Sequence, residues 1–279
     1  MKLSIITINL NNLIGLEKTI ASVFNQIFRD FEYLVIDGCS TDGSVELLRQ
    51  NSNKISYWIS EPDLGIFQAM NKGIRKANGD YLLFLNSGDF LLHDHVLSSV
   101  FRNNPEEDIL CGTSLISKNG KALYYSAPPD RFTLRFFCNH NIPHQSTFIR
   151  KSIFKKYGYY REDFRLKSDF EFWIRVIIVN NCTTKKLGIA ISDYNLEGIS
   201  IDPVNAEQGR NEMKIALESN IPPAIWFDYL DWFNDPFKMK VFDWARSRRL
   251  ILVIMKLFYE FASIAYLIRK RFRKSESRV

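Results

Sequence analysis

The sequence predicts an α/β fold, with a doubly wound, mainly parallel sheet and a C-terminal helical extension. Strand-like apolar segments alternate with amphipathic helical segments from residue 3 to residue 89. The run at 81–85 is apolar without interruption, as expected of a strand covered on both faces in the middle of a parallel sheet. Three strand-like segments are each followed by an aspartate: Asp37, Asp63 and Asp89. These observations predict acids gathered at one edge of the sheet.

The first half of the chain divides into strand–helix units. Residues 3–10 form the first predicted strand, and Asn12 is the expected N-cap of a helix at 13–26. Two further units follow, with strands at 31–37 and 55–60 and helices at 44–50 and 66–77. Gly79 lies where a helix C-cap is expected, just before the strand at 81–85.

The central strand stops at Asn86-Ser87-Gly88-Asp89, a small polar segment that ends in a carboxylate. In open α/β sheets, ligands bind beyond the carboxyl ends of the strands. A carboxylate at this place, near an amide and a hydroxyl, suits a hard divalent cation that holds phosphate oxygens. The alternative is an ordinary turn, since these residue types are common in turns.

The second half is predicted to complete the sheet. Residues 108–117 and 121–127 read as a hairpin across Asn119-Gly120, and 148–157 as a strand followed by a helix. A buried helix is expected at 169–179 and a last strand at 185–192. Pro222 and Pro223 mark the expected end of the globular domain, which gives a domain at 1–220 and a helical tail at 221–279.

Several polar residues in these segments have both a functional and a structural interpretation. Asp37 could bind a nucleoside or belong to a capped turn, and Lys72 could face a diphosphate or be solvated. His144 lies among polar residues in a loop, where a site role and a structural role are equally compatible with the sequence. Asp169 opens its helix, either as a general base or as an acid that stabilises the helix dipole.

The basic character of the chain belongs to its tail. The net charge is +6, but the segment from Arg246 onward contains 10 Lys/Arg and 2 Asp/Glu, which leaves the rest near neutral. Such asymmetry indicates an anionic partner for the tail. The four cysteines are scattered without a CxxC pair, which predicts reduced thiols in a cytoplasmic protein and neither a disulfide framework nor a zinc site.

Residues 250–268 are apolar except for Lys256, Glu260 and Ser263, and basic residues lie on both sides of them. Two charges inside the segment oppose a membrane-spanning helix, whereas an interfacial helix on an anionic membrane surface tolerates them. We therefore expect peripheral association with the inner face of the cytoplasmic membrane. Packing against the globular domain or a dimer partner is the alternative, and nucleic acid is not expected because the tail offers apolar surface rather than base-stacking grooves.

Six segments in order resemble the family 2 glycosyltransferases of the GT-A fold, in particular the bacterial branch that builds capsule, O-antigen and exopolysaccharide. The segments are ITINLNN, VIDGCSTDGS, SEPDLGIFQAMNKGI, GDYLLFLNSGD, PHQSTFIRK and SDFEFW, and the resemblance extends over residues 2–200. The resemblance implies an inverting, Mn²⁺- or Mg²⁺-dependent transfer from a nucleotide-diphosphate sugar, with a UDP-sugar favoured. The acceptor it implies is a hydroxyl of a lipid-linked or growing glycan.

The resemblance also implies roles for individual residues. By motif, Asp89 falls on the metal ligand, Asp169 on the base that deprotonates the acceptor, and Thr7 and Asp37 on residues that bind the nucleobase. Asp63, Lys72 and Asn86 complete the expected donor site, with Asn86 standing in for a ribose-binding acid whose usual place is taken by Gly88.

Other functional classes are less compatible with the sequence. A Rossmann dehydrogenase would need GxGxxG after the first strand, and residues 9–15 do not supply it. A non-catalytic nucleotide-sugar-binding protein is the alternative function, since binding residues can persist without turnover.

Overall fold

The chain divides into two compact units, Met1–Ile221 and Pro222–Val279. The computed structural model describes residues 1–196, 198 and 202–233, together with positions 253, 256, 257, 259, 260 and 263. In the second unit the described helix is α9 (Pro223–Phe233), and most of the predicted interfacial segment at 250–268 lies outside the described residues. No helix in the described part of the chain is long and apolar enough to cross a membrane.

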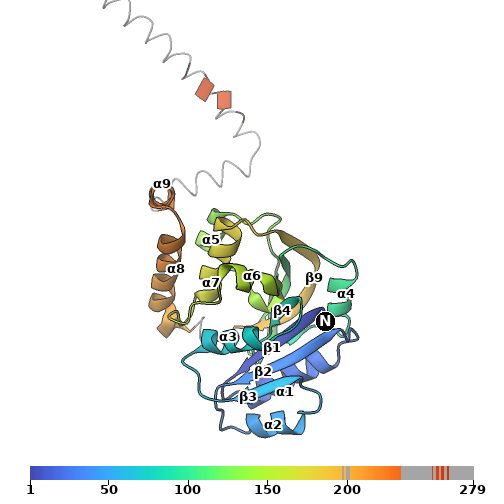
Figure 1. Cartoon of the computed structure of the whole chain (residues 1–279). Coiled ribbons are helices and arrows are strands. Elements are labelled where there is room, and N and C mark those ends of the chain that lie inside the picture. Colours follow the sequence, from blue (N-terminus) through green and yellow to red (C-terminus); the bar gives the residue numbers. More distant parts are fainter. Residues whose placement is uncertain are drawn as a thin grey trace, which may run out of the picture. The chain divides into compact units, whose positions relative to one another are not determined.

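The first unit begins with alternating strands and helices, as the sequence predicts (Figure 1). Its first half contains β1 (Leu3–Asn9), α1 (Leu13–Phe24), β2 (Phe31–Asp37), α2 (Ser44–Gln50), β3 (Tyr57–Ser60), α3 (Ile66–Lys76) and β4 (Tyr81–Phe84). Its second half contains β5 (Phe90–Leu91), α4 (Val96–Phe101), β6 (Ile109–Lys118), β7 (Lys121–Ser126), α5 (Leu134–Asn139), β8 (Thr147–Arg150), α6 (Lys151–Tyr157), α7 (Ser168–Trp173), β9 (Thr184–Asn195) and α8 (Ala206–Asn220).

The described strands form one mixed sheet in the order β3-β2-β1-β4-β8-β6-β9-β5, with β7 paired to β6. Strands β1 to β4 are parallel to one another, and β8 joins β4 in the antiparallel sense. At the far side, β9 runs parallel to β6 and antiparallel to β5, so that Phe90 is paired with Asp193. This last pairing brings the end of β9 beside the segment that follows β4.

Helices cover both faces of the sheet, which makes it doubly wound. On one face, Leu3 and Ile5 of β1 share a core with residues of α1, α2 and α4. On the other face α3 lies so close to the sheet that a Cβ at Gly73 would be 2.5 Å from Cγ2 of Ile6. Aromatic rings of β4, α6 and α7 also pack together on that face, among them Phe84, Phe154 and Phe172. The side chains of β1 therefore alternate between two cores, as a central strand requires.

The structure refines the predicted second half of the chain. The helix expected at 169–179 begins at Ser168 and continues beyond Trp173 as a wider π-helical segment, Ile174–Val179. The last strand extends to Asn195, three residues beyond its predicted end. That extension matters for the site, because its final residues lie next to Asp89.

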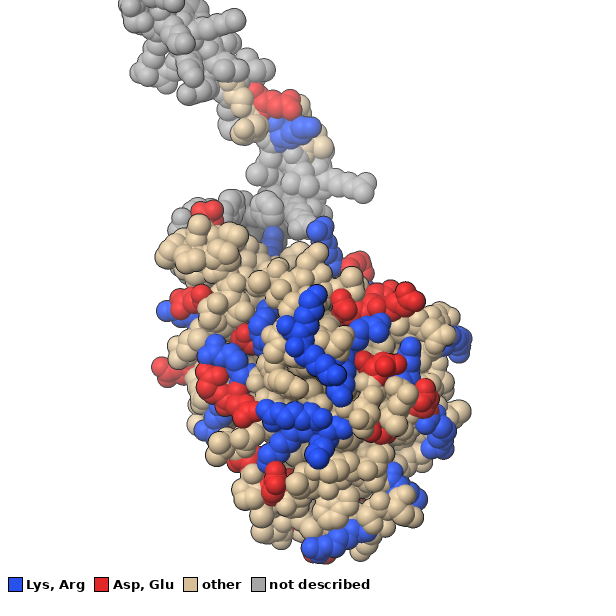
Figure 2. Space-filling view, in the orientation of Figure 1, with Lys and Arg blue, Asp and Glu red and all other residues tan. Residues whose placement is uncertain are grey.

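Charges of both signs occur on the face of the first unit that Figure 2 shows. On the face seen in Figure 2, Lys and Arg side chains lie among Asp and Glu side chains. This agrees with the near-neutral balance of the chain before Arg246.

Candidate functional site

A cavity of about 800 Å³ lies beyond the carboxyl end of β4. Its walls come from the start of α1, from α3, from the β6–β7 hairpin and from the end of β9, and the segments at 141–145 and 165–169 complete them. Of the residues that the sequence assigns to the site, the cavity is lined by Asn86, Asp89 and Asp169. Three cationic side chains, Lys18, Arg165 and Lys167, also line it.

The segment after β4 is fixed by contacts with α1. Gly88 donates its backbone N–H to Oγ1 of Thr19 at 3.0 Å, and Oγ1 donates to the carbonyl of Asp89 at 2.7 Å. The side chain of Asn12 donates to the carbonyl of Ser87 at 2.9 Å. Gly88 has φ +104°, a backbone conformation that residues with a Cβ atom rarely adopt, and this explains the glycine at this position. The turn therefore holds Asn86 and Asp89 in fixed positions on the cavity wall.

Asp89 is a buried carboxylate, with 6% of its surface exposed. Burial raises its pKa from 3.8 to about 7, against the lowering effects of the backbone N–H of Asn195 and the side chain of Gln145. The carboxylate of Asp193 lies near enough to add to the rise in pKa. Among the described residues, no Lys or Arg forms an ion pair with Asp89. Its anionic form is therefore poorly stabilised by the protein alone.

These features fit a divalent cation held mainly by a substrate. The described residues contain no group of three or more His, Cys, Asp or Glu side chains arranged to hold a metal ion. Mg²⁺ is commonly bound by one or two carboxylates together with substrate phosphates and water. Asp89 supplies an oxygen ligand whose charge a cation would neutralise, so the residues present suit a cation that arrives with a diphosphate.

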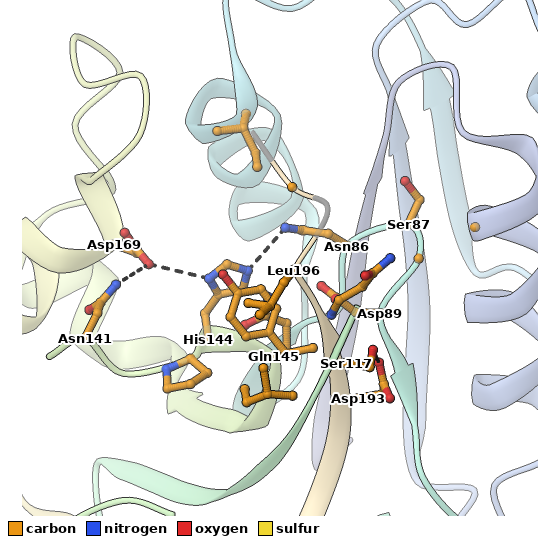
Figure 3. A pocket seen from close by; sticks show the side chains of 18 of the residues that line it. Asn86, Ser87, Asp89, Ser117, Asn141, His144, Gln145, Asp169, Asp193 and Leu196 are labelled. Carbon is orange, nitrogen blue, oxygen red and sulfur yellow. Dashed lines mark hydrogen bonds and ion pairs between the residues drawn. The ribbon is translucent and has the colours of Figure 1, made fainter. Parts of the chain in front are cut away.

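Asp169 faces the cavity from the first turn of α7, and two side chains converge on its Oδ2 atom (Figure 3). Asn141 donates from Nδ2 at 3.0 Å, and Nδ1 of His144 lies 3.6 Å away. Oδ1 accepts the backbone N–H of Phe170 at 2.8 Å. The side chain thus makes a local contact within its helix and also presents an oxygen to the cavity, so the helix-stabilising and base interpretations both have contacts to support them.

His144 connects Asp169 to the end of β4. Its Nε2 atom lies 3.2 Å from Nδ2 of Asn86, so one imidazole bridges the two residues across the cavity wall (Figure 3). From the sequence alone, His144 has both a site role and a structural role open to it and is not assigned to the site. The polar loop around it is the signal that could have identified it, but only the fold shows which residues it meets.

Thr7 and Asp37 lie beneath the site rather than in the cavity lining. Thr7 donates to the carbonyl of Leu85 at 2.7 Å and accepts from the hydroxyl of Tyr33 at 2.9 Å. Asp37 has no exposed surface, and its oxygens accept from Asn9, from Ser60, and from the backbone N–H and hydroxyl of Ser40. In this structure both side chains bind other parts of the protein, and their predicted contacts with a nucleobase stay predictions.

Asp63 and Lys72 form an ion pair with each other. Nζ of Lys72 lies 2.6 Å from Asp63 and 2.7 Å from Glu61, and neither Lys72 nor Asp63 lines the cavity. The two carboxylates raise the pKa of Lys72, although burial acts in the opposite direction. A donor that uses Lys72 would have to compete with Asp63 and Glu61, and the donor-binding roles of Asp63 and Lys72 stay predictions.

Strand β9 contributes site residues that are not predicted from the sequence. Asp193 is buried beside Asp89 and accepts a short hydrogen bond from the hydroxyl of Ser117, and Asn195 donates its backbone N–H to Asp89 at 3.3 Å. The predicted strand at 185–192 ends before both of them. The pairing of β9 with β5, which joins segments about a hundred residues apart, places them at the site.

The chain is similar to known glycosyltransferases over most of its length. Residues 4–158 match the model of glycosyl transferase family 2. An uncharacterized glycosyltransferase of Mycobacterium tuberculosis (strain ATCC 25618 / H37Rv) is 34% identical over 206 residues, which cover 70% of this chain and 76% of that protein. A PGL/p-HBAD biosynthesis glycosyltransferase of Mycobacterium bovis (strain BCG / Pasteur 1173P2) is 29% identical over 198 residues, covering 69% of this chain and 76% of the relative.

Solved structures share the fold. The structure of S. aureus TarS 1-349 in complex with UDP-GlcNAc superposes with a TM-score of 0.60 at 19% identity, covering 80% of this chain and 68% of that one. Mannosyltransferase PcManGT from Pyrobaculum calidifontis, in complex with GDP-Man and Mn²⁺, gives a TM-score of 0.55 at 12% identity, covering 72% of this chain and 58% of that one. These likenesses confirm the predicted GT-A fold. The family match over more than half of the sequence and the relative that is 34% identical establish that the chain belongs to glycosyltransferase family 2.

Proposed function

We propose that the protein is an inverting, metal-dependent glycosyltransferase that transfers a sugar from a nucleotide-diphosphate sugar to an acceptor hydroxyl. The observation that carries the proposal is a single cavity with a buried, cation-compatible carboxylate at the end of β4 and an oriented carboxylate on α7. Asp89 serves the diphosphate end of the donor, and Asp169 serves the acceptor. The cavity is large enough for a ligand of this size.

The chemistry follows from these two carboxylates. A bound Mg²⁺ or Mn²⁺, held by Asp89 and the donor phosphates, would neutralise the charge that develops on the departing diphosphate. Asp169 accepts the proton of the acceptor hydroxyl as its oxygen attacks the anomeric carbon from the face opposite the leaving group. A direct displacement needs no carboxylate nucleophile, in contrast to the retaining mechanism of glycosidases.

Cationic side chains support a diphosphate in this cavity. In the described part of the chain no ion pair includes Lys18, Arg165 or Lys167, although all three line the cavity with Asp89. Positive side chains gathered around a cavity attract phosphate oxygens and strengthen their binding. Asn86, whose Oδ1 is buried without a hydrogen-bond partner among the described residues, offers an acceptor for a donor hydroxyl.

The donor and acceptor classes are drawn from similar proteins. TarS was solved with UDP-GlcNAc and with UDP, which supports a UDP-sugar as the first donor to test, and the structure of PcManGT contains Mn²⁺. The name of the Mycobacterium bovis relative refers to PGL/p-HBAD biosynthesis. We propose a lipid-linked or growing glycan as the acceptor, presented at the inner face of the cytoplasmic membrane, where the tail binds anionic lipid.

A donor screen with matched variants tests this function. Purified full-length protein is incubated with individual UDP-sugars and Mn²⁺, with and without glycan acceptors, and released UDP and product are measured. Transfer by the wild type, lost in Asp169→Asn although donor binding persists, supports the enzyme. Tight binding of a nucleotide sugar to the wild type without any turnover would instead identify a non-catalytic binding protein.

A further inference from the structure

We propose that His144 is a positioning residue for Asp169, with its tautomer set by Asn86, so that its Nδ1–H points at the carboxylate that accepts the acceptor proton. The inference rests on the proposed function of Asp169 as base. It is carried by the two contacts of the imidazole, one to Asn86 at the end of β4 and one to Asp169 on α7 (Figure 3).

The contact with Asn86 determines which nitrogen of His144 carries the proton. Nδ2 of Asn86 can only donate, so Nε2 of His144, 3.2 Å away, must present its lone pair. A neutral imidazole with an unprotonated Nε2 carries its hydrogen on Nδ1. Nδ1 is the nitrogen that faces Oδ2 of Asp169, at 3.6 Å. The amide therefore selects the tautomer that donates toward the carboxylate.

The same arrangement orients Asp169. Asn141 donates to Oδ2 at 3.0 Å and Phe170 donates to Oδ1 at 2.8 Å, so the plane of the carboxylate is already restricted. The His144 contact, at 3.6 Å, is longer than a hydrogen bond, and catalytic contacts of this kind often shorten only when substrates are bound. With Nδ1–H of His144 as a third donor, the carboxylate would be held in one orientation, and the acceptor hydroxyl could approach it from one direction only.

The backbone around His144 does not depend on its imidazole. The turn His144–Ser146 is held by the hydroxyl of Thr147, which donates to the carbonyl of Pro143 at 2.8 Å, and by a backbone bond from Ser146 to the same carbonyl. With 13% of its surface exposed, the imidazole lies in the cavity wall rather than in the core. Substitutions at His144 should therefore change the site more than the fold.

Two amide substitutions separate the two contacts. The amide nitrogen of Asn occupies roughly the place of Nδ1 and can donate to Asp169, whereas the amide oxygen of Gln can take the place of Nε2 and accept from Nδ2 of Asn86. His144→Asn therefore keeps a donor toward Asp169, whereas His144→Gln keeps only the contact with Asn86. We expect kcat for His144→Gln to fall by about 10-fold or more, as for other residues that orient a catalytic group, while His144→Asn retains most of kcat. The KM for the donor should be unchanged in His144→Gln, because this variant keeps the contact with the donor-binding residue Asn86.

A purely structural role for His144 predicts a different pattern. Both variants would then lose activity in proportion to their loss of thermal stability, and equal losses in kcat at unchanged Tm would also overturn the proposal. In an Asp169→Asn background, changing His144 should have little further effect, because the group that it positions is gone.

A spectroscopic measurement tests the tautomer without relying on turnover. The chain has four histidines, so the ¹⁵N signals of His144 in the full-length protein can be assigned by their absence in His144→Gln. At a pH where the imidazole is neutral, we expect the Nδ1–H tautomer in wild type and its loss in Asn86→Ala. An Nε2–H tautomer in wild type would overturn the inference even if glycosyl transfer is demonstrated, and the expected tautomer would stand even if no donor is found.

Discussion

Individual carboxylates carry different chemistry in this site because their surroundings differ. Asp89 is buried beside a second carboxylate, and its pKa is raised to about 7 by burial. Asp169 instead has donors on both of its oxygens, from Asn141 and from the backbone of Phe170. A buried carboxylate without a Lys or Arg partner can be neutralised by a bound metal ion, as is proposed for Asp89. A carboxylate whose orientation is fixed by hydrogen-bond donors can accept a proton from a correctly placed hydroxyl, as is proposed for Asp169.

Asp169→Asn is expected to lower kcat by about 10²-fold or more, with the KM for the donor little changed. The amide has nearly the same size and keeps an oxygen for the N–H of Phe170, but it cannot accept a proton. Steady-state kinetics with a saturating acceptor measure the change. Near-normal turnover would return Asp169 to its helix-stabilising interpretation.

Asp89 is expected to make the metal-free protein less stable as pH rises. The folded state binds the Asp89 proton more tightly than the unfolded state does, because the folded pKa is about 7 and the ordinary value is 3.8. The contribution of the Asp89 proton to the free energy of unfolding is therefore complete below pH 3.8. It is lost as pH rises toward 7, at up to about 1.4 kcal/mol per pH unit. Urea unfolding of wild type and Asp89→Asn across this range, in the presence of a chelator, measures the difference.

The variant is the control for every other titrating group, so only the difference between the two pH curves is attributed to Asp89. Above pH 7, Mn²⁺ added together with UDP should raise the stability of wild type and have a smaller effect on Asp89→Asn. Parallel pH curves, or equal stabilisation of the two proteins by Mn²⁺ with UDP, would contradict the assignment.

At the scale of elements, the position of α3 on the sheet depends on one glycine. Alanine at an interior helix position is normally stabilising by about 1 kcal/mol relative to glycine. At Gly73 the added Cβ would lie 2.5 Å from Cγ2 of Ile6, so packing opposes the helix propensity. The distance indicates that packing wins, because the neighbouring atom belongs to a fully buried side chain that cannot move aside.

Gly73→Ala is therefore expected to lower the free energy of unfolding by about 1–3 kcal/mol, measured by urea denaturation. Gly209→Ala in α8 is the matched control, since the added Cβ would lie 3.2 Å from Cε of the flexible Lys167 side chain and at an ordinary contact distance of 3.9 Å from Cδ1 of Leu166. The control should be neutral or slightly stabilising. A stabilised Gly73→Ala protein would show that α3 can shift away from β1 at little cost.

Elements also differ in how they bring residues to the site. The turn after β4 continues a strand of the parallel half of the sheet, so its position follows from the strand itself. The end of β9 reaches the same place through antiparallel pairing with β5. Sequence periodicity identifies both strands, but it does not reveal which strands become neighbours.

At the scale of the whole molecule, the segment from Arg246 onward differs in charge and composition from the rest of the chain. The chain before Arg246 carries nearly balanced charges, whereas the tail is strongly basic and contains a long apolar segment. Electrostatic attraction to a membrane is screened by salt, but the burial of apolar side chains is not. The two contributions can therefore be separated by experiment.

Full-length protein is expected to bind anionic liposomes with an affinity that weakens, but does not vanish, as salt increases. Truncation before Arg246 should abolish this binding and leave an enzyme that is active on a water-soluble acceptor but poor on a lipid-linked one. Co-sedimentation and acceptor assays measure both effects. If the truncated protein aggregates or no longer unfolds cooperatively, the tail packs on the globular domain. If the truncated protein unfolds normally and the full-length protein does not bind the vesicles, a partner protein is the better explanation.

The sequence by itself determined the alternation of strands and helices, the buried central strand and the carboxylate at its end. These features are local: an unbroken apolar run requires cover on both faces, and a strand that stops at polar residues places them at the sheet edge. The order of six segments was enough to indicate the family, which the family match confirms. Asn86, Asp89 and Asp169 accordingly line one cavity.

Only the tertiary structure decided which other residues share that cavity. Asn86 and His144 are 58 positions apart and meet because β4 and the turn before β8 lie side by side, and Asp193 reaches Asp89 because β9 pairs with β5. Thr7 and Asp37 do not line the cavity, because the packing of the strands places them where Leu85, Asn9 and Ser60 form hydrogen bonds with their side chains. Local propensity and periodicity carry no information on such long-range contacts, because they depend on how whole elements pack.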